Sequence, residues 1–187
     1  MARKLILDSS SIINFLRYYY FDKNSDNIIN AKLNNFIMTK IANHEILVID
    51  KVFNELHRPE TIDIKKKIKK DVIDSVYLFP IVENLIDDYY IKSNERFLGN
   101  DPELIETEIS KYEDTYADLY LIALCMEILK KNNKVILISE ETLSRDDKLI
   151  KKIPTICRDK KIKCEDLPFM LFSIYKDELI FDLEAKN

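Results

Sequence analysis

Glycine is almost absent from this chain, which has one glycine, Gly99, in 187 residues. Loops that cradle phosphates and dinucleotides need several glycines at fixed spacing, so nucleotide sites of those kinds are excluded. Tryptophan is absent, and histidine and cysteine are scarce, at two and three residues. The histidines and cysteines show no zinc-ligand spacing, so we expect reduced thiols packed in the core of a cytoplasmic protein. The three cysteines are Cys125, Cys157 and Cys164.

Long apolar runs are also missing. No stretch approaches the roughly 20 apolar residues that a membrane span requires. Asp8 interrupts the first apolar stretch, which argues against a secretory signal. The net charge is −4, from 29 basic and 33 acidic residues, which argues against a general nucleic-acid coat protein but is compatible with a nuclease. We therefore expect a cytoplasmic protein that does not enter membranes.

Short apolar runs alternate with segments of helical periodicity, which predicts a single α/β domain over residues 1–175 and a charged tail over 176–187. Fully apolar strands indicate a central parallel β-sheet flanked by α-helices on both faces, with extra helices in the middle of the chain. The expected strands cover 4–7, 46–49, 135–138 and 162–165. The expected helices cover 10–20, 28–41, 51–56, 62–75, 81–113, 112–131 and 167–175, with an extended connection at 77–79 that Pro80 closes.

Acidic residues stand near the ends of the predicted strands. Asp8 ends the first strand, Glu55 follows the second, Asp118 begins the long helix, and Glu141 follows the third strand. Right-handed crossovers between parallel strands would bring the four carboxylates to one edge of the sheet. Because two carboxylates about 5 Å apart repel by roughly 3 kcal/mol at a dielectric constant near 20, such a cluster needs a cation.

An oxygen-only cluster suits Mg²⁺ or Mn²⁺, and such an ion activates water for phosphodiester hydrolysis. A plainer interpretation stays open: among 33 acidic residues, some fall near strand ends by chance, and acids favour helix N-termini. Asp114, one helical turn before Asp118, is either a further ligand or a solvated first-turn acid.

The acidic pattern resembles that of the PIN-domain ribonucleases. The matching strings are Leu-Asp-Ser-Ser-Ser-Ile-Ile at 7–13, Ala-Asp-Leu-Tyr-Leu-Ile-Ala-Leu at 117–124 and Ser-Glu-Glu at 139–141. The chain is also similar, over about 4–175, to a bacterial PIN-like branch related to toxin-type members, through the strings at 17–22, 152–157 and 162–164. The resemblance is weakest across 60–112.

The resemblance implies a PIN-like domain that acts as a Mg²⁺- or Mn²⁺-dependent endoribonuclease on single-stranded RNA. It implies Asp8, Glu55 and Asp118 as primary ligands, with Glu141 or its neighbour Glu140 completing the site. Ser10 and Ser139 would supply supporting hydroxyls. It further implies the toxin of a toxin–antitoxin pair, with a small antitoxin protein as partner, and a homodimer.

The chain departs from the family pattern at two positions: Ser10 replaces the commoner Asn, and Glu141 replaces the usual Asp. The second change leaves open an inactive PIN-like module that serves as an interaction partner. A haloacid-dehalogenase-like phosphatase is a further alternative, but it needs a second Asp where this chain has Ser10.

Basic residues offer candidate substrate contacts. Arg17, with the tyrosines at 18–20, follows the first acidic motif on the same predicted helix and could hold a phosphate beside a stacked base. Rim and core aromatics are the alternative. The lysine run at 65–70 predicts a solvated helix face, with an RNA-binding groove as the alternative.

Overall fold

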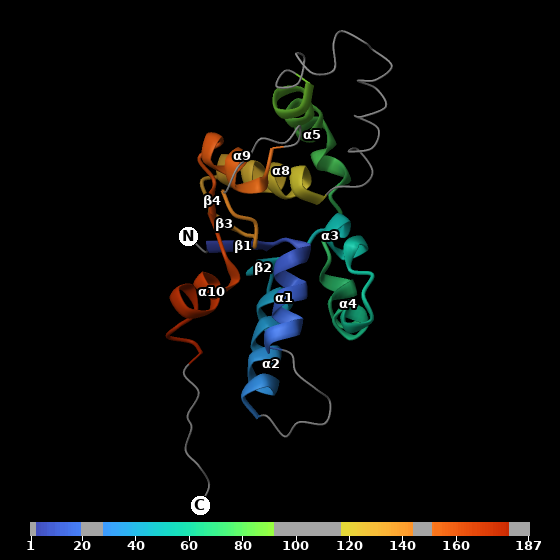
Figure 1. Ribbon diagram of the computed structural model, residues 1–187, viewed down its shortest axis with the longest axis vertical. Coiled ribbons are helices and arrows are strands. Elements are labelled where there is room, and N and C mark those ends of the chain that lie inside the picture. Colours follow the sequence, from blue (N-terminus) through green and yellow to red (C-terminus); the bar gives the residue numbers. More distant parts are fainter. Residues whose placement is uncertain (1–2, 20–27, 92–116, 144–150, 180–187) are drawn as a thin grey trace, which may run out of the picture.

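A computed structural model describes residues 3–19, 28–91, 117–143 and 151–179 of the chain. Within these residues the molecule is built on a four-stranded parallel sheet in the order β2-β1-β3-β4 (Figure 1). The strands are β1 (Arg3–Leu7), β2 (Ile46–Leu47), β3 (Lys134–Ile138) and β4 (Lys163–Glu165). The predicted α/β class with a central parallel sheet is therefore confirmed.

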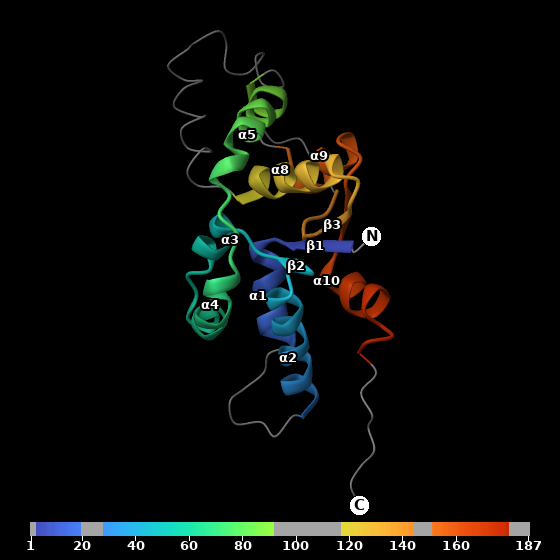
Figure 2. The same cartoon turned by 180° about the vertical axis from the view of Figure 1, so that it is seen from behind.

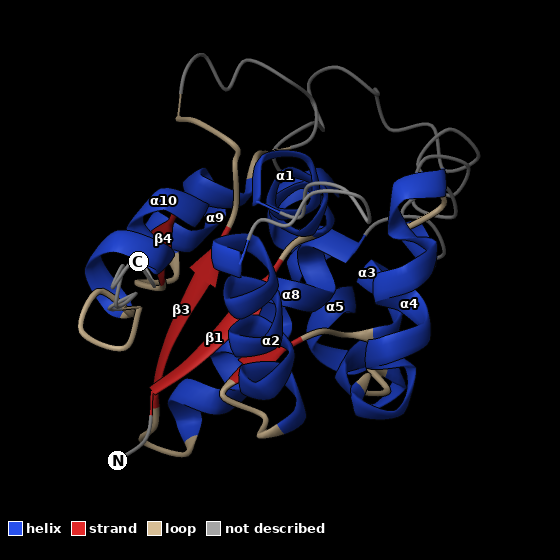
Figure 3. Cartoon of the chain, turned by 90° about the horizontal axis from the view of Figure 1, so that it is seen from below, coloured by secondary structure: helices blue, strands red, loops and turns tan. Residues whose placement is uncertain are grey.

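The strand order places a topological switch between β1 and β3. The chain leaves β1 for β2 on one side, then crosses back to β3 on the other side, where Leu5 is in register with both Ile46 and Ile136. Figure 3 shows β1 and β3 side by side, pointing toward the end of the sheet at which α1 lies. In open α/β sheets, ligands bind in the crevice beyond the carboxyl ends of the strands at such a switch.

Helices cover both faces of the sheet (Figures 1 and 2). The pair α1 and α2 lies on one face, together with α10, and α8 and α9 lie on the other. The α-helices are α1 (Ser9–Tyr19), α2 (Ile28–Ala42), α3 (Asp50–Glu55), α4 (Ile62–Ile68), α5 (Phe79–Ile86), α8 (Ala117–Lys130), α9 (Ile153–Asp159) and α10 (Leu167–Phe169). Short 3-10 or π turns complete the described helices: η1 (Pro59–Thr61), η2 (Lys69–Asp71), η3 (Val76–Leu78), η4 (Asp87–Ile91) and η5 (Met170–Ile174).

The core lies between the sheet and these helices. The inner strands are apolar along their length because both faces are covered, and Ile6, Leu137 and Ile138 are fully buried. Helix α8 is buried from Leu119 to Cys125, on every side of its axis, so it is a central helix. Its predicted start at residues 112–116 lies outside the described residues. None of the described helices is long and apolar enough to cross a membrane.

Three local predictions were wrong or incomplete. The segment expected to be extended at 77–79 is helical, and Pro80 stands in the first turn of α5, where the missing N–H costs nothing. The helix expected over 62–75 ends earlier, because Ile73 pairs in parallel with Ile49 beside β2. Helix α9 was not predicted: Pro154 reads as a helix breaker, yet it lies in the first turn of that helix.

Three helix-to-strand turns each contain a residue in the left-handed region. They are His44 before β2, Asn132 before β3 and Lys161 before β4, with φ of 54°, 57° and 56°. The N–H of the next residue returns to the helix, as in the bond from Ile162 to the Cys157 carbonyl at 2.8 Å. This position in a helix cap usually holds glycine. A chain with one glycine fills it with other residues.

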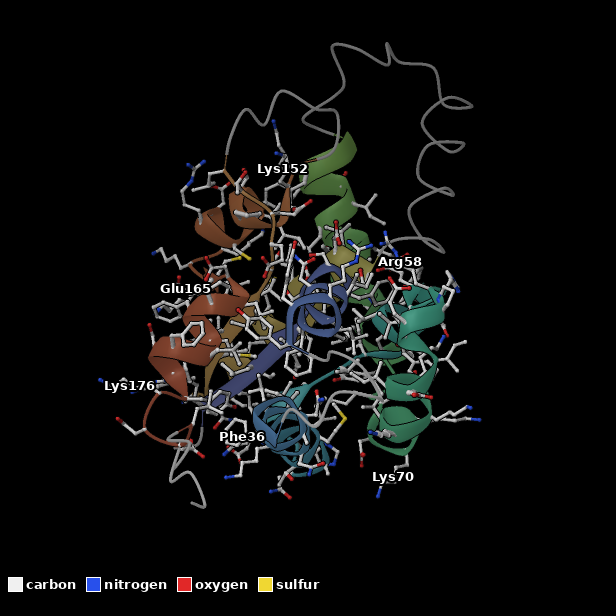
Figure 4. All side chains as sticks on the ribbon, turned by 60° about the horizontal axis from the view of Figure 1, so that its bottom comes forward. Phe36, Arg58, Lys70, Lys152, Glu165 and Lys176 are labelled. Carbon is white, nitrogen blue, oxygen red and sulfur yellow. The ribbon has the colours of Figure 1, made fainter. Side chains whose placement is uncertain are left out.

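The segment after η5 packs back on α2. The Phe36 and Tyr175 rings meet edge to face at 5.1 Å, and Lys40 Nζ lies 2.7 Å from a Glu178 carboxylate oxygen. Figure 4 shows Phe36 and Lys176 toward the end of the molecule where β1 begins. Of the expected tail at 176–187, residues 180–187 lie outside the described residues.

Candidate functional site

Asp8 lies directly after β1, with 5% of its surface exposed. Its Oδ1 accepts a hydrogen bond from the Ser11 backbone N–H at 2.6 Å, and its Oδ2 accepts one from the Ser10 hydroxyl at 2.8 Å. The carboxylate therefore satisfies an N–H in the first turn of α1, which would otherwise lack a helical partner. The sequence places Asp8 at the carboxyl edge, and the start of α1 holds it there.

Ser11 connects this turn to the neighbouring strand. Its buried hydroxyl lies 3.2 Å from the Ile138 carbonyl oxygen at the end of β3, and 3.5 Å from Glu140 Oε1. The Asp8 N–H also donates to the Ile138 carbonyl, at 3.1 Å. The ends of β1 and β3 are thus joined at the switch point. The sequence analysis missed Ser11, although the run of three serines after the first strand was the signal that could have identified it.

Glu55 and Asp118 come together where α3 meets α8. Glu55 is the last residue of α3, and its Oε1 accepts a hydrogen bond from the Ala117 N–H at 3.1 Å. Ala117 is the first described residue of α8, and Asp118 follows it. A carboxylate at the positive end of α8 is favourable for the helix dipole. The same contact places Glu55 beside the turn that contains Asp118.

The two glutamates after β3 point to different helices. Glu140 Oε1 accepts from the Leu167 N–H at the start of α10, and Glu141 Oε2 accepts from the Ile153 N–H at the start of α9, both at 2.9 Å. Ser139, which is buried, supports this turn because its hydroxyl oxygen accepts from the Glu141 N–H at 3.2 Å.

The electrostatics of Asp118 show which of these acids share a neighbourhood. Burial, followed by the charges of Glu141, Glu55 and Asp8, raises the pKa of Asp118 from 3.8 to about 7. The structure therefore brings the four predicted carboxylates within electrostatic reach of one another. Glu140 is not among the charges that raise this pKa. Of the two alternatives left open by the sequence, Glu141 is the one that acts on Asp118.

These side chains provide carboxylate and hydroxyl oxygens, which is the donor chemistry that Mg²⁺ and Mn²⁺ prefer. In the part of the chain that the structure describes, no three His, Cys, Asp or Glu side chains already converge at metal-ligand spacing. Helix starts hold three of the acids in place: Asp8 at α1, Glu55 at α8 and Glu141 at α9. The donor set fits a hard divalent cation, and binding would draw these oxygens closer together.

The remaining predicted residues lie in several places. Ser10 and Ser139 contact the acidic cluster through Asp8 and Glu141. Asp114 lies outside the described residues. Arg17, on α1, lies 3.7 Å from a Glu60 carboxylate oxygen, with 47% of its side chain exposed. It therefore links α1 to η1 at the surface, and its role as a substrate contact stays a prediction.

The lysine run follows α4 and η2. Lys65 packs its Nζ over the Phe53 ring, 4.5 Å from the centroid. Lys67 and Lys70 line a cavity of about 350 Å³, which Asn35 and Thr39 of α2 border on the other side. None of the four acids lines this cavity. The run thus divides between packing on α3 and a groove against α2.

A comparison with protein families gives one assignment. A family model described as "Domain of unknown function (DUF4411)" matches residues 5–174. The chain belongs to this family. The match contains the whole sheet and all four carboxylates, so the DUF4411 region and the folded domain coincide over the described core. No curated protein and no solved structure matches the chain.

Proposed function

We propose that this DUF4411 chain is a metal-dependent endoribonuclease of the PIN-like kind. One observation supports the proposal most: Asp118 has a pKa near 7 because it is buried beside the charges of Glu141, Glu55 and Asp8. Such a cluster at the switch point of a parallel sheet is costly for folding unless a proton or a cation compensates it. Strongly perturbed acids in a crevice favour a functional site over a purely structural one.

In this proposal Asp8, Glu55 and Asp118 would hold Mg²⁺ or Mn²⁺, with Glu141 completing the site. When bound, the ion supplies an activated water and stabilises negative charge that develops on the phosphate. The chain positions the carboxylates through the hydrogen bonds from Ser11 and Ala117 to Asp8 and Glu55. Because these bonds come from backbone N–H groups at helix starts, the ligand positions are set before a cation or substrate arrives.

Basic side chains at the same end of the molecule would contact the substrate. Figure 4 shows Lys152 and Arg58 toward the end at which β1 terminates. Lys152 precedes the α9 N-terminus that Glu141 holds, and Arg58 follows Glu55 by three residues. Lysine and arginine provide most contacts to nucleic-acid phosphates. Single-stranded RNA as substrate, the toxin role, an antitoxin partner and a homodimer extend this proposal and depend on the PIN resemblance alone.

A second candidate, an inactive PIN-like interaction module, is favoured by one observation. Three of the four acids already have a structural role, since each accepts a hydrogen bond from a backbone N–H at a helix start. A protein that had lost catalysis would keep such carboxylates for folding. The phosphatase alternative gains no such support, because Ser10 occupies the position of its required second Asp and donates a hydrogen bond to Asp8.

The test is cleavage of a mixed single-stranded RNA pool with Mn²⁺ by the wild type, Asp118→Asn and the control Glu83→Gln. Glu83 is exposed on α5 and is not one of the predicted site residues. We expect Asp118→Asn to reduce cleavage by at least about 100-fold, the upper end of the range for residues that only support ligands. Glu83→Gln should cleave as the wild type does.

The same three proteins are then heated with and without Mn²⁺. A ligand that binds only the folded state raises the unfolding temperature, so the wild type and Glu83→Gln should gain stability, whereas Asp118→Asn should gain little. Absence of both cleavage and the Mn²⁺-dependent gain in the wild type would favour the inactive module.

A further inference from the structure

The three cysteines of the chain come together from three different elements. Cys125 lies on α8, Cys157 on α9 and Cys164 on β4. The Cys157 and Cys164 thiols are hydrogen-bonded to each other, and Cys125 is close enough to interact electrostatically with both. All three are free thiols. Two thiols in direct contact can be oxidised to a disulfide with little movement of the backbone.

The turn between α9 and β4 sets this contact. Lys161, with φ of 56°, reverses the chain after α9, and the Ile162 N–H donates to the Cys157 carbonyl at 2.8 Å. Cys164 then enters β4, where it is in register with Leu137 of β3. The two sulfur atoms are therefore brought together by a turn closed through the backbone and a paired strand.

The three thiols differ in exposure. Cys125 and Cys157 are fully buried, whereas Cys164 is partly exposed. An oxidant from solvent therefore meets Cys164 first, and Cys157 is the thiol in contact with it. Cys125 has no direct hydrogen bond in this group and is enclosed within the central helix α8.

We propose that Cys157 and Cys164 are an oxidisable pair that closes to an intramolecular disulfide, and that Cys125 does not participate. With hydrogen peroxide as oxidant, the Cys164 sulfur attacks an oxygen of the peroxide, forms a sulfenic acid and releases one water. The Cys157 sulfur then attacks the Cys164 sulfur, the S–S bond forms, and the hydroxyl leaves as a second water with the Cys157 proton. Two thiols lose two electrons and two protons in total, and one peroxide is reduced to two waters.

The surroundings keep the pair reduced until an oxidant arrives. The hydrogen bond with Cys164, together with burial, raises the pKa of the Cys157 thiol. A protonated thiol is a poor nucleophile, so oxidation should be slow at neutral pH and faster at alkaline pH. A metal would be a different use of three cysteines, but no such group in the described residues has metal-ligand spacing.

The bond would connect the last turn of α9 to β4, at the end of α9 opposite the one that Glu141 holds. It would fix this helix at both ends. The inference concerns the thiols alone and does not depend on the proposed nuclease function.

The test is a disulfide map of the full chain after treatment with hydrogen peroxide. The reduced protein is oxidised under native conditions, alkylated in denaturant, and digested with trypsin without reductant. Trypsin cleaves between the two cysteines, because Arg158, Lys160, Lys161 and Lys163 separate them. We expect peptide 153–158 joined to peptide 164–176, with the cross-link lost on reduction and Cys125 alkylated.

Two variants are the matched controls. Cys125→Ala should keep the cross-link, and Cys164→Ser, at the partly exposed position, should abolish it without emptying a buried site. Three alkylated cysteines after peroxide treatment would overturn the proposal, as would a cross-link through Cys125. A cross-link found only between two copies of the chain, increasing with protein concentration, would also overturn it.

Discussion

The two ends of the sheet both contain features that cost folding free energy, but the costs are of different kinds. At the carboxyl end, Asp118 is buried beside three other carboxylates, and the cost is electrostatic. At the amino end, His44 and Lys161 adopt left-handed backbone angles, and the cost is conformational. Left-handed angles cost non-glycine residues roughly 1–2 kcal/mol.

The difference between the ends lies in what would relieve each cost. At the amino end, a change to glycine would relieve it without altering the fold, so the cost follows from the scarcity of glycine in the chain. At the carboxyl end, a neutral residue would relieve it but would remove the group that makes the site reactive. Costs of the second kind are expected where function opposes stability. The predictions that follow test this distinction.

The largest effect is expected from Asp118→Asn in the absence of divalent cations. The wild-type carboxyl has a pKa of about 7 when folded, against 3.8 as the ordinary value. Between these pH values the folded chain holds a proton that the unfolded chain has lost, so wild-type stability should fall as pH rises from about 4 to 7. At about 1.4 kcal/mol per pH unit, the variant should be more stable at pH 8 by up to about 4 kcal/mol.

Urea unfolding at pH 4, 6 and 8 in EDTA measures this difference between the variant and the wild type. The two proteins should converge at pH 4, where the carboxyl is largely protonated in both states. The control Glu83→Gln should follow the wild type throughout. Equal stability of Asp118→Asn and wild type at pH 8 would mean that Asp118 is solvated like an ordinary surface acid.

A smaller and more specific effect is expected from the adjacent glutamates. Glu141→Gln removes the largest of the charges acting on Asp118, so the pKa of Asp118 should fall. Glu140→Gln is the matched control, because Glu140 accepts from Leu167 at α10 and is not among those charges. Each variant loses one negative charge at a helix start, worth about 0.3–1 kcal/mol. Titration of the Asp118 carboxyl carbon by NMR distinguishes the two, and equal curves would contradict the assignment of Glu141.

Sequence patterns predicted the sheet and the approximate positions of the acids, because buried parallel strands are continuous apolar runs and Asp8 follows the first of them. They failed where a proline had two interpretations. Pro80 and Pro154 were not expected to begin helices, since a proline in the first turn is favourable while one further along is disruptive. Periodicity also cannot show which carboxylates satisfy helix starts, and for that reason the separate roles of Glu140 and Glu141 required the structure.

The smallest effect is expected at the amino end of the sheet. His44→Gly and Lys161→Gly should each raise the free energy of unfolding by about 0.5–1 kcal/mol, because glycine adopts positive φ without the steric cost. Asn132→Gly should gain less, since asparagine tolerates this region better than most residues. Lys66→Gly, in the exposed part of α4, is the control and should lose about 1 kcal/mol. Urea unfolding measures all four variants. A loss of stability in both His44→Gly and Lys161→Gly would show that the side chains at these turns contribute more than the backbone angle costs, and the proposed contrast between the two ends of the sheet would then fail.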